Sequence, residues 1–244
     1  MISFETIHYQ EVTSTNEVLK ELFRDGRVGE GTVILADFQT EGKGRENNSW
    51  FSDPGANLLL SILFKPDIDA TSHFLLNEFV SLSIIEALRD FDAEAMIKWP
   101  NDIYLQGKKL AGILVENVIV SGRITSSVVG IGLNLDQKRF PEDLPNPVSL
   151  NDLREEPVKR SEVLDILLAR LKARYEYLSE TKHQALHADY LENVYMMGEP
   201  VIYRVNDKNK RGLLTDIKPG GELVIKGDQG KSRLYLFGEI TLFS

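Results

Sequence analysis

Two long helical patterns enclose a run of β-type segments, and this order constrains the fold more than any other feature of the 244-residue chain. In residues 73–91, apolar side chains recur every three or four positions, which predicts an amphipathic helix. Residues 163–178 repeat this spacing. The segment between them has turn signals at 106–107 and 121–122 and predicts a β-meander. We therefore predict an α+β fold in which a mixed β-sheet is backed by helices.

The chain divides into two parts that differ in their sequence pattern. After residue 198 it consists of short β-type runs separated by glycine-rich turns. Roughly 45 residues of this kind cannot bury a large core alone, so we expect them to pack on the rest of the chain. The prediction is a main domain over residues 1–195 and a small β-barrel over residues 196–244.

A shorter helix is predicted directly after the sequence Ser14-Thr15-Asn16-Glu17. A serine followed three positions later by glutamate is typical of a capping box, in which the two side chains bind the free amides of the first helical turn. Gly26 marks the end of this helix.

The composition excludes several classes of protein. The chain has no cysteine, which excludes disulfides, thiolate metal sites and cysteine nucleophiles. Its start is not that of a signal peptide, and no stretch approaches the roughly 18 apolar residues of a membrane helix. A net charge of −9 repels nucleic acid. We expect a cytoplasmic protein that acts on small molecules or proteins, without DNA or a membrane as a partner.

Three motif-like patterns do not have the residues that their chemistry needs. His183 and His187 have the spacing of a zinc protease, but Gln184 stands where the general base is required, so we expect ordinary surface histidines of a helix. Residues 42–44 (Gly-Lys-Gly) lack the flanking residues of a Walker loop. Residues 130–132 (Gly-Ile-Gly) lack the third glycine of a dinucleotide fingerprint.

Three clusters remain as candidates for a binding site. The loop over residues 39–50 alternates glycines with cations, which suits the approach of an anion, although a solvated turn is the alternative. Residues 98–102 (Lys-Trp-Pro-Asn-Asp) and 108–114 place lysines beside the end of a strand, where a plain hairpin is the alternative. Residues 130–134 put two glycines in a strand, which weakens it unless a ligand or another backbone comes close.

Taken together and in this order, these clusters resemble the catalytic domain of the biotin–protein ligases. The match covers about residues 10–135, and Gly238-Glu239-Ile240 fits the small C-terminal barrel typical of that family. One such motif is weak evidence, but five in the same order are specific. The matching residues are Ser14-Thr15-Asn16, Gln39, Gly42-Lys43-Gly44-Arg45, Trp50, Lys98-Trp99-Pro100-Asn101-Asp102, Lys109-Leu110-Ala111-Gly112 and Gly130-Ile131-Gly132-Leu133-Asn134.

The resemblance implies a class II synthetase-like biotin/lipoate ligase domain with an SH3-like C-terminal barrel, and it implies a role for each matching residue. Catalysis is implied for Lys109, Arg45 and Asp102. Contacts to ATP or the adenylate are implied for Arg45, Trp50, Lys98, Asn101 and Asn134, although a core position explains Trp50 nearly as well. Contacts to biotin are implied for Ser14, Thr15, Asn16, Gln39, Gly42, Lys43, Gly44, Arg45, Lys109, Gly112, Leu114 and Gly132.

The implied activity is the ATP-dependent activation of biotin as biotinyl-5′-AMP and its transfer to a lysine of a biotin carboxyl carrier protein or domain. Mg²⁺ is implied through the ATP phosphates, with Asp102 as one candidate contact and no firm protein ligand. Two alternatives stay open: a lipoate or octanoate ligase of the same fold, and a non-catalytic biotin sensor or transcriptional regulator. The resemblance also leaves open whether the chain forms a homodimer.

The chain departs from the family pattern in two respects. Many members have arginine at the position of Lys43, and further glycines and arginines where this chain has residues 46–49 (Glu-Asn-Asn-Ser). Lysine keeps the charge but lacks the planar fork of arginine, so the loop is less basic than usual. The catalytic motifs begin at Ser14, from which we expect the monofunctional form, without the N-terminal helix-turn-helix domain of some members.

Overall fold

The computed structural model describes residues 2–45, 48–227 and 229–243, and in these residues the main sheet has eight strands. Their order is β1-β2-β3-β8-β7-β6-β5, with β4 paired to β8. Strands β1 and β2 run parallel and the other pairs are antiparallel, which confirms the predicted mixed sheet. The strands are β1 Glu5–Val12, β2 Thr32–Gln39, β3 Leu58–Phe64, β4 Ile68–Asp69, β5 Ala95–Lys98, β6 Asp102–Leu105, β7 Lys108–Val120 and β8 Arg123–Leu133.

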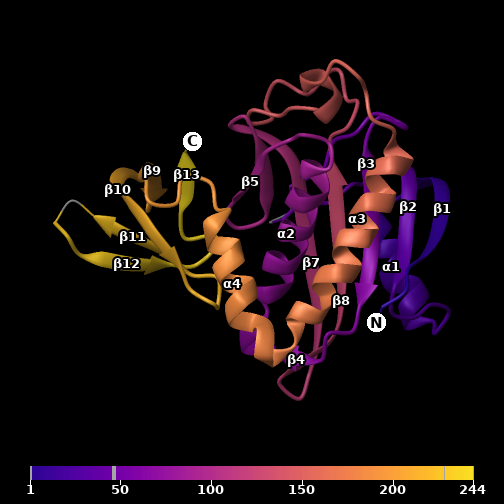
Figure 1. Ribbon diagram of the computed structural model, residues 1–244, viewed down its shortest axis with the longest axis horizontal. Coiled ribbons are helices and arrows are strands. Elements are labelled where there is room, and N and C mark those ends of the chain that lie inside the picture. The colour runs from indigo at the N-terminus through magenta and orange to yellow at the C-terminus, as the bar shows by residue number, and fades with distance from the viewer. Residues whose placement is uncertain (1, 46–47, 228, 244) are drawn as a thin grey trace.

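Helices cover both faces of this sheet. Helix α1 (Thr15–Arg24) packs Leu19 and Leu22 against one face, while α2 (Leu75–Arg89) and α3 (Arg160–Arg174) belong to the larger core on the other. Figure 1 shows α2 and α3 lying across the sheet. Every residue of β3 is buried, which explains its almost unbroken apolar sequence.

The remaining helical segments are short. The second predicted helix, 163–178, is divided, because its last four residues form a 3₁₀ turn after α3. No helix among the described residues is both long and apolar enough to cross a bilayer. The segments are α4 His183–Glu192 and the 3₁₀ turns η1 Ala70–Ser72, η2 Leu150–Leu153, η3 Tyr175–Leu178 and η4 Glu180–Lys182.

The two predicted hairpin turns are confirmed. Gln106 and Gly107 have φ values of 51° and 73°, and Ser121 and Gly122 have values of 51° and 78°. Two successive residues in the left-handed region match the right-handed twist of the flanking strands. These turns join β6 to β7 and β7 to β8, so the meander forms the part of the sheet nearest the C-terminal segment.

The C-terminal segment forms a five-stranded antiparallel sheet in the order β12-β11-β10-β9-β13. It lies beside α4 and β5 in Figure 1, and its side chains join the same hydrophobic core as the main sheet. The described residues contain no pairing between β12 and β13, so closure into a barrel and the domain division at residue 195 stay predictions. The strands are β9 Pro200–Val205, β10 Lys208–Ile217, β11 Leu223–Gly227, β12 Ser232–Tyr235 and β13 Thr241–Phe243.

The prediction of two surface histidines is wrong for His187. Its Nδ1 lies 2.6 Å from Oε1 of Glu78, whose side chain is fully buried on α2. The hydrogen bond to Glu78 raises the pKa of His187, and burial raises the pKa of Glu78. The pair therefore joins α4 to α2 at the edge of the core, with Glu78 buried and His187 partly exposed. Within the described ranges, no group of three or more His, Asp or Glu residues is placed to hold a metal ion.

Candidate active site

One cavity of about 680 Å³ collects most of the residues that the sequence singles out. It lies over β7 and β8 and is bounded by the loop after β2, the turn after β5 and the C-terminal sheet. Of the predicted site residues, Gly42 and Asn134 do not line it. Those that do are Ser14, Thr15, Asn16, Gln39, Lys43, Gly44, Arg45, Trp50, Lys98, Asn101, Asp102, Lys109, Gly112, Leu114 and Gly132.

One end of the cavity is a hydrogen-bonded cluster of neutral polar side chains. The backbone N–H and the hydroxyl of Thr15 both donate to Oε1 of Gln39, at 2.8 and 3.0 Å. Ser61 Oγ lies 2.7 Å from Thr15 Oγ1 and 2.5 Å from Asn16 Oδ1. Because Gln39 and Ser61 come from neighbouring strands, the sheet fixes the start of α1. This end is preorganised for a small polar ligand.

The predicted capping box at the start of α1 is wrong. Ser14 occupies the N-cap position and is buried, but its side chain makes no capping hydrogen bond. The carboxylate of Glu17 binds Lys20 at 2.8 Å and Lys43 at 2.6 Å instead. Hydrogen bonds from these two lysines hold the pKa of Glu17 below its ordinary value. Two charged partners outcompete a backbone amide for the same oxygens.

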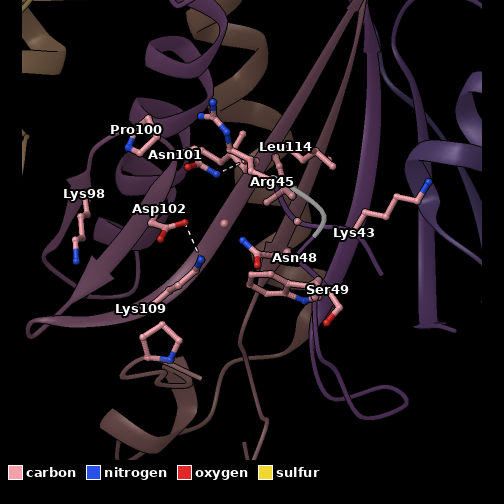
Figure 2. A pocket seen from close by; sticks show the side chains of 18 of the residues that line it. Lys43, Arg45, Asn48, Ser49, Lys98, Pro100, Asn101, Asp102, Lys109 and Leu114 are labelled. Carbon is pink, nitrogen blue, oxygen red and sulfur yellow. Dashed lines mark hydrogen bonds and ion pairs between the residues drawn. The ribbon is translucent and has the colours of Figure 1, made fainter. Parts of the chain in front are cut away.

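Lys43 is turned away from the centre of the cavity. Figure 2 shows its side chain directed away from Asp102 and Lys109, and its amine is the one bound by Glu17. Lys20 also contacts Glu116 at 2.9 Å, and Glu116 accepts a hydrogen bond from Asn16 at 2.6 Å. The polar end therefore continues into a network of charged residues on α1 and β7.

The other end of the cavity is cationic. Lys109 Nζ lies 2.8 Å from Oδ1 of Asp102, and both side chains are partly exposed. Lys98 Nζ donates to the hydroxyl of Tyr104 at 3.0 Å and lies over its ring. Burial lowers the pKa of Lys98. With Arg45, these residues give three cationic side chains around one cavity, an arrangement suited to phosphate oxygens.

A β-bulge turns Lys109 towards the cavity. On β7, Gly112 and Leu114 line the cavity, so strict alternation would place Lys109 on the opposite, core-facing side. The pairing with β6 shifts, because Ile103 pairs with Ala111 while Tyr104 pairs with Lys109. Leu110 is therefore the extra residue; it is fully buried, and the lysine before it changes faces.

The turn after β5 is held to β7 by Asn101. The side-chain amide of Asn101 donates to the backbone carbonyl of Ile113 at 2.7 Å, and the backbone carbonyl of Asn101 accepts from the Ile113 N–H at 2.9 Å. The Trp99–Pro100 peptide bond is cis. Asn101 thus has a structural function in this turn, and it places Asp102 at the cavity.

Trp50 explains the two glycines in the floor of the cavity. A Cβ atom at Gly132 would lie 2.4 Å from Trp50 Cε2, and one at Gly112 would lie 2.9 Å from Trp50 Cζ3. At Gly130 and Gly132 the sequence predicts a close approach by a ligand or another backbone. The indole makes this approach at Gly132, and the Asn16 side chain makes it at Gly130. The indole N–H is buried without a hydrogen-bond partner among the described residues.

Gly42 supports this arrangement from outside the cavity. Its carbonyl accepts from the Trp50 N–H at 2.8 Å, and a Cβ atom there would lie 2.6 Å from the Trp50 carbonyl oxygen. Only glycine fits so close to another backbone. Gly44 N–H donates to Asn48 O at 2.7 Å. Within the less basic segment 46–49, Glu46 and Asn47 lie outside the described residues.

Asn134 lies beside the main cavity. It lines a smaller one of about 70 Å³, which shares Trp50 and Lys109 with the first. Its backbone N–H donates to Leu110 O at 2.9 Å, and its carbonyl accepts from Leu150 N–H at 3.0 Å. Asn134 therefore lies in an adjoining cavity, with Trp50 and Lys109 at the border of the two.

Sequence reasoning missed several residues of the site. Ser61 is the one polar residue in the apolar strand Leu58–Phe64, and a lone polar residue in such a strand is a sequence signal for a site residue. Tyr104 follows the cluster at 98–102 by two positions. The C-terminal residues Phe237 and Thr241–Phe243 carry no such signal, because they line the cavity only through the packing of the two sheets.

Known proteins share this sequence pattern and this fold. Residues 9–134 match the sequence profile of the biotin/lipoate A/B protein ligase family, which is more than half of the chain. The chain belongs to this family. The structure aligns with the biotin protein ligase of Aquifex aeolicus solved in complex with biotin and ATP, with a TM-score of 0.81, 29% identity and 98% of both chains covered.

Two curated relatives of this ligase family place the chain in its biotin branch. The bifunctional ligase/repressor BirA of Escherichia coli (strain K12) is 32% identical over 96% of this chain and 72% of the relative. The biotin–[acetyl-CoA-carboxylase] ligase of Paracoccus denitrificans is 31% identical over 81% of this chain and 85% of the relative. The predicted membership of the biotin–protein ligases is thereby confirmed.

Proposed function

We propose that the chain activates biotin with ATP as biotinyl-AMP and transfers the biotinyl group to a lysine of a biotin carboxyl carrier protein or domain. The observation that carries this proposal is the division of one cavity into a neutral hydrogen-bonding end and a cationic end. The first suits the ureido ring of biotin, and the second suits the carboxylate and the phosphates that react.

At the neutral end, Thr15, Asn16 and Gln39 bind the ureido group. Their cluster contains donors and acceptors on adjacent atoms, as a cyclic urea requires. Ser14 and Leu114 complete the wall, and Gly112 and Gly132 form the floor with the Trp50 ring upon it. A pocket lined by apolar and aromatic surface, with a few precisely placed polar groups, is typical of a small-molecule site.

At the cationic end, an oxygen of the biotin carboxylate attacks the α-phosphate and pyrophosphate leaves. Two anions must approach within bonding distance, and Lys109 and Arg45 offset their repulsion. The contact to Asp102 holds the Lys109 amine at the cavity before substrates arrive. In this scheme Lys98 and Asn101 contact the nucleotide from the turn after β5, and Asn134 contacts it from the adjoining smaller cavity.

Mg²⁺ enters this scheme as a partner of the ATP phosphates. It prefers oxygen ligands and keeps several waters, and one carboxylate together with phosphate oxygens is a usual set for it. Asp102 is a carboxylate at the phosphate end of the cavity and fits this use. Bound Mg²⁺ would neutralise phosphate charge during adenylate formation.

In the second step, the amine of the carrier lysine attacks the carbonyl of the mixed anhydride, and AMP leaves with the bonding electron pair. The amine must arrive neutral and loses a proton when the amide forms. Asp102 is the residue that we assign to orient it or accept that proton, since its carboxylate lies beside Lys109 in the cavity. The proposal includes the cytoplasm as the compartment of this reaction.

A comparison of three substrates tests the proposal. Purified protein is incubated with ATP and Mg²⁺, and pyrophosphate exchange is measured with biotin, lipoate and octanoate in parallel. We expect exchange with biotin, and AMP release with modification of one lysine when a carrier domain is added. Exchange with lipoate or octanoate alone would favour the other branch of the family. Biotin binding without exchange would identify a sensor.

A further inference from the structure

Arg45 and Phe237 meet at the cavity from distant parts of the chain. The guanidinium carbon of Arg45 lies 3.4 Å from the centroid of the Phe237 ring. Arg45 belongs to the loop between β2 and β3, and Phe237 follows β12 of the C-terminal sheet. A cation over an aromatic face is attracted by the ring's quadrupole. The contact therefore connects the loop to the C-terminal sheet.

The ring of Phe237 is held independently of Arg45. Its centroid lies 5.9 Å from that of the Trp99 ring, and Trp99 Nε1 donates to the Gly221 carbonyl at 2.9 Å. Within its own turn, the Leu236 N–H donates to Glu239 Oε2 at 2.8 Å, and Phe237 forms a backbone bridge with Ile240. Phe237 is thus a preformed support on which the arginine rests.

This support is compatible with phosphate binding. A guanidinium group stacks through its face, while its N–H donors lie in its plane and point outward from the edge. One arginine can therefore rest on a ring and donate to phosphate oxygens at the same time. A long side chain loses rotamer freedom when it binds a ligand, and a ring that already holds it reduces that cost.

We propose that Phe237 is a positioning residue that holds Arg45 at the cavity, so that the acyl-adenylate stays bound until the carrier lysine arrives. This proposal rests on the proposed function, because biotinyl-AMP is the ligand that Arg45 retains. Phe237 acts through Arg45 and takes no part in bond formation. The C-terminal sheet thereby contributes to the selectivity of the reaction, since an adenylate that escapes reacts with any exposed lysine.

The test compares Phe237→Leu with Phe237→Tyr, which keeps the aromatic face. Protein loaded with labelled biotinyl-AMP is diluted into unlabelled biotin and ATP, and the release rate of the label is measured. We expect Phe237→Leu to release the adenylate on the order of fivefold faster, the factor of a modest cation–π contact. Phe237→Tyr should restore retention. Phe23→Leu removes a comparable Lys65–ring contact outside the cavity and should release at the wild-type rate.

A double-mutant cycle shows whether the effect passes through Arg45. In the Arg45→Gly background, Phe237→Leu should add little, because the partner of the ring is already gone. An equal effect in both backgrounds, or wild-type retention by Phe237→Leu, would overturn the proposal. If Phe237→Leu does not fold, Phe237→Met fills a similar volume without a ring and takes its place.

A second readout is independent of activity. The Nε–Hε proton of Arg45 should show an upfield ring-current shift by NMR in the wild type and in Phe237→Tyr, and lose it in Phe237→Leu. Without that shift in the wild type, Phe237 does not position Arg45, whatever the enzyme does. If the shift is present but no adenylate forms with biotin and ATP, the proposed function fails and Phe237 has no adenylate to retain.

Discussion

Lys109 Nζ lies 2.8 Å from Asp102 Oδ1 because a β-bulge at Leu110 turns the lysine onto the cavity face of β7. Without the bulge, Lys109 would point towards the core, and Asp102 would lose this cationic partner. The bulge therefore places the charge that the first step of the proposed reaction needs. Bulges are common next to active sites for this reason.

Replacement of Lys109 by alanine should abolish most adenylate formation. The loss of one cation that stabilises developing charge costs roughly 10²–10³-fold in rate. Pyrophosphate exchange with saturating biotin and ATP measures it. Lys108→Ala is the matched control, because Lys108 is exposed on the same strand and does not line the cavity. Equal exchange by wild type and Lys109→Ala would remove Lys109 from the mechanism.

Replacement of Ser61 by alanine should weaken biotin binding. The hydroxyl connects Thr15 to Asn16 and holds the Asn16 carbonyl in place. A hydrogen bond of this kind contributes about 1 kcal/mol, and the part of it that positions Asn16 for the ligand is lost from binding, so we expect affinity to fall by up to roughly fivefold. Calorimetric titration with biotin measures the change.

Ser81→Ala is the control for this experiment. Ser81 is equally buried, but its hydroxyl has no hydrogen-bond partner in the described part of the chain. Its replacement should leave biotin affinity unchanged. If both variants bind biotin like the wild type, Ser61 does not organise the polar end.

Replacement of Gly132 by alanine should displace the Trp50 ring. The new methyl group would lie 2.4 Å from Trp50 Cε2, and overpacking of this kind costs about 1–3 kcal/mol of unfolding free energy. Thermal unfolding and biotin titration measure the two effects. Gly29→Ala has nothing within 4 Å of the new methyl group and should change stability little. Wild-type stability and affinity for Gly132→Ala would show that the indole does not rest on this strand.

The Glu78–His187 pair should make stability depend on pH. The folded-state pKa of His187 is raised above 6.5, so the folded protein binds a proton that the unfolded chain releases. The stabilisation is complete below pH 6.5 and is lost as pH rises through the raised pKa. The raised pKa of Glu78 acts in the same direction, from its ordinary value of 4.5 upward.

Denaturant unfolding at several pH values checks this dependence. We expect the free energy of unfolding to fall in the wild type as pH rises above 6.5, and to fall less in His187→Gln. His73→Gln serves as the control, because His73 is not part of this pair. A parallel pH dependence in the wild type and His187→Gln would refute the role of the pair.

The sequence predicted the fold because its signals are local. The hairpin turns at 106–107 and 121–122 have glycines where the backbone adopts positive φ, and the helix at 75–89 follows its apolar spacing. The motifs between Ser14 and Asn134 predicted most of the cavity lining, since each is a short segment whose residues act together.

The errors arose where a distant residue decided the outcome. The local sequence predicts a capping box with Glu17, but Lys43 comes close enough to bind its carboxylate. The local sequence predicts a surface position for His187, but α2 brings the buried Glu78 to its ring. In both cases a charged partner from another element competes with the local interaction that the sequence predicts.

The sequence by itself determined the mixed α+β architecture, the two turns of the meander and the segments that form the site. Only the tertiary structure decided which face Lys109 occupies, that Trp50 rests on Gly112 and Gly132, and that Phe237 supports Arg45. The first group depends on backbone preferences and the spacing of neighbouring residues, which the chain carries locally. The second depends on a bulge and on the packing of two sheets, because side chains far apart in the sequence meet only when the core is formed.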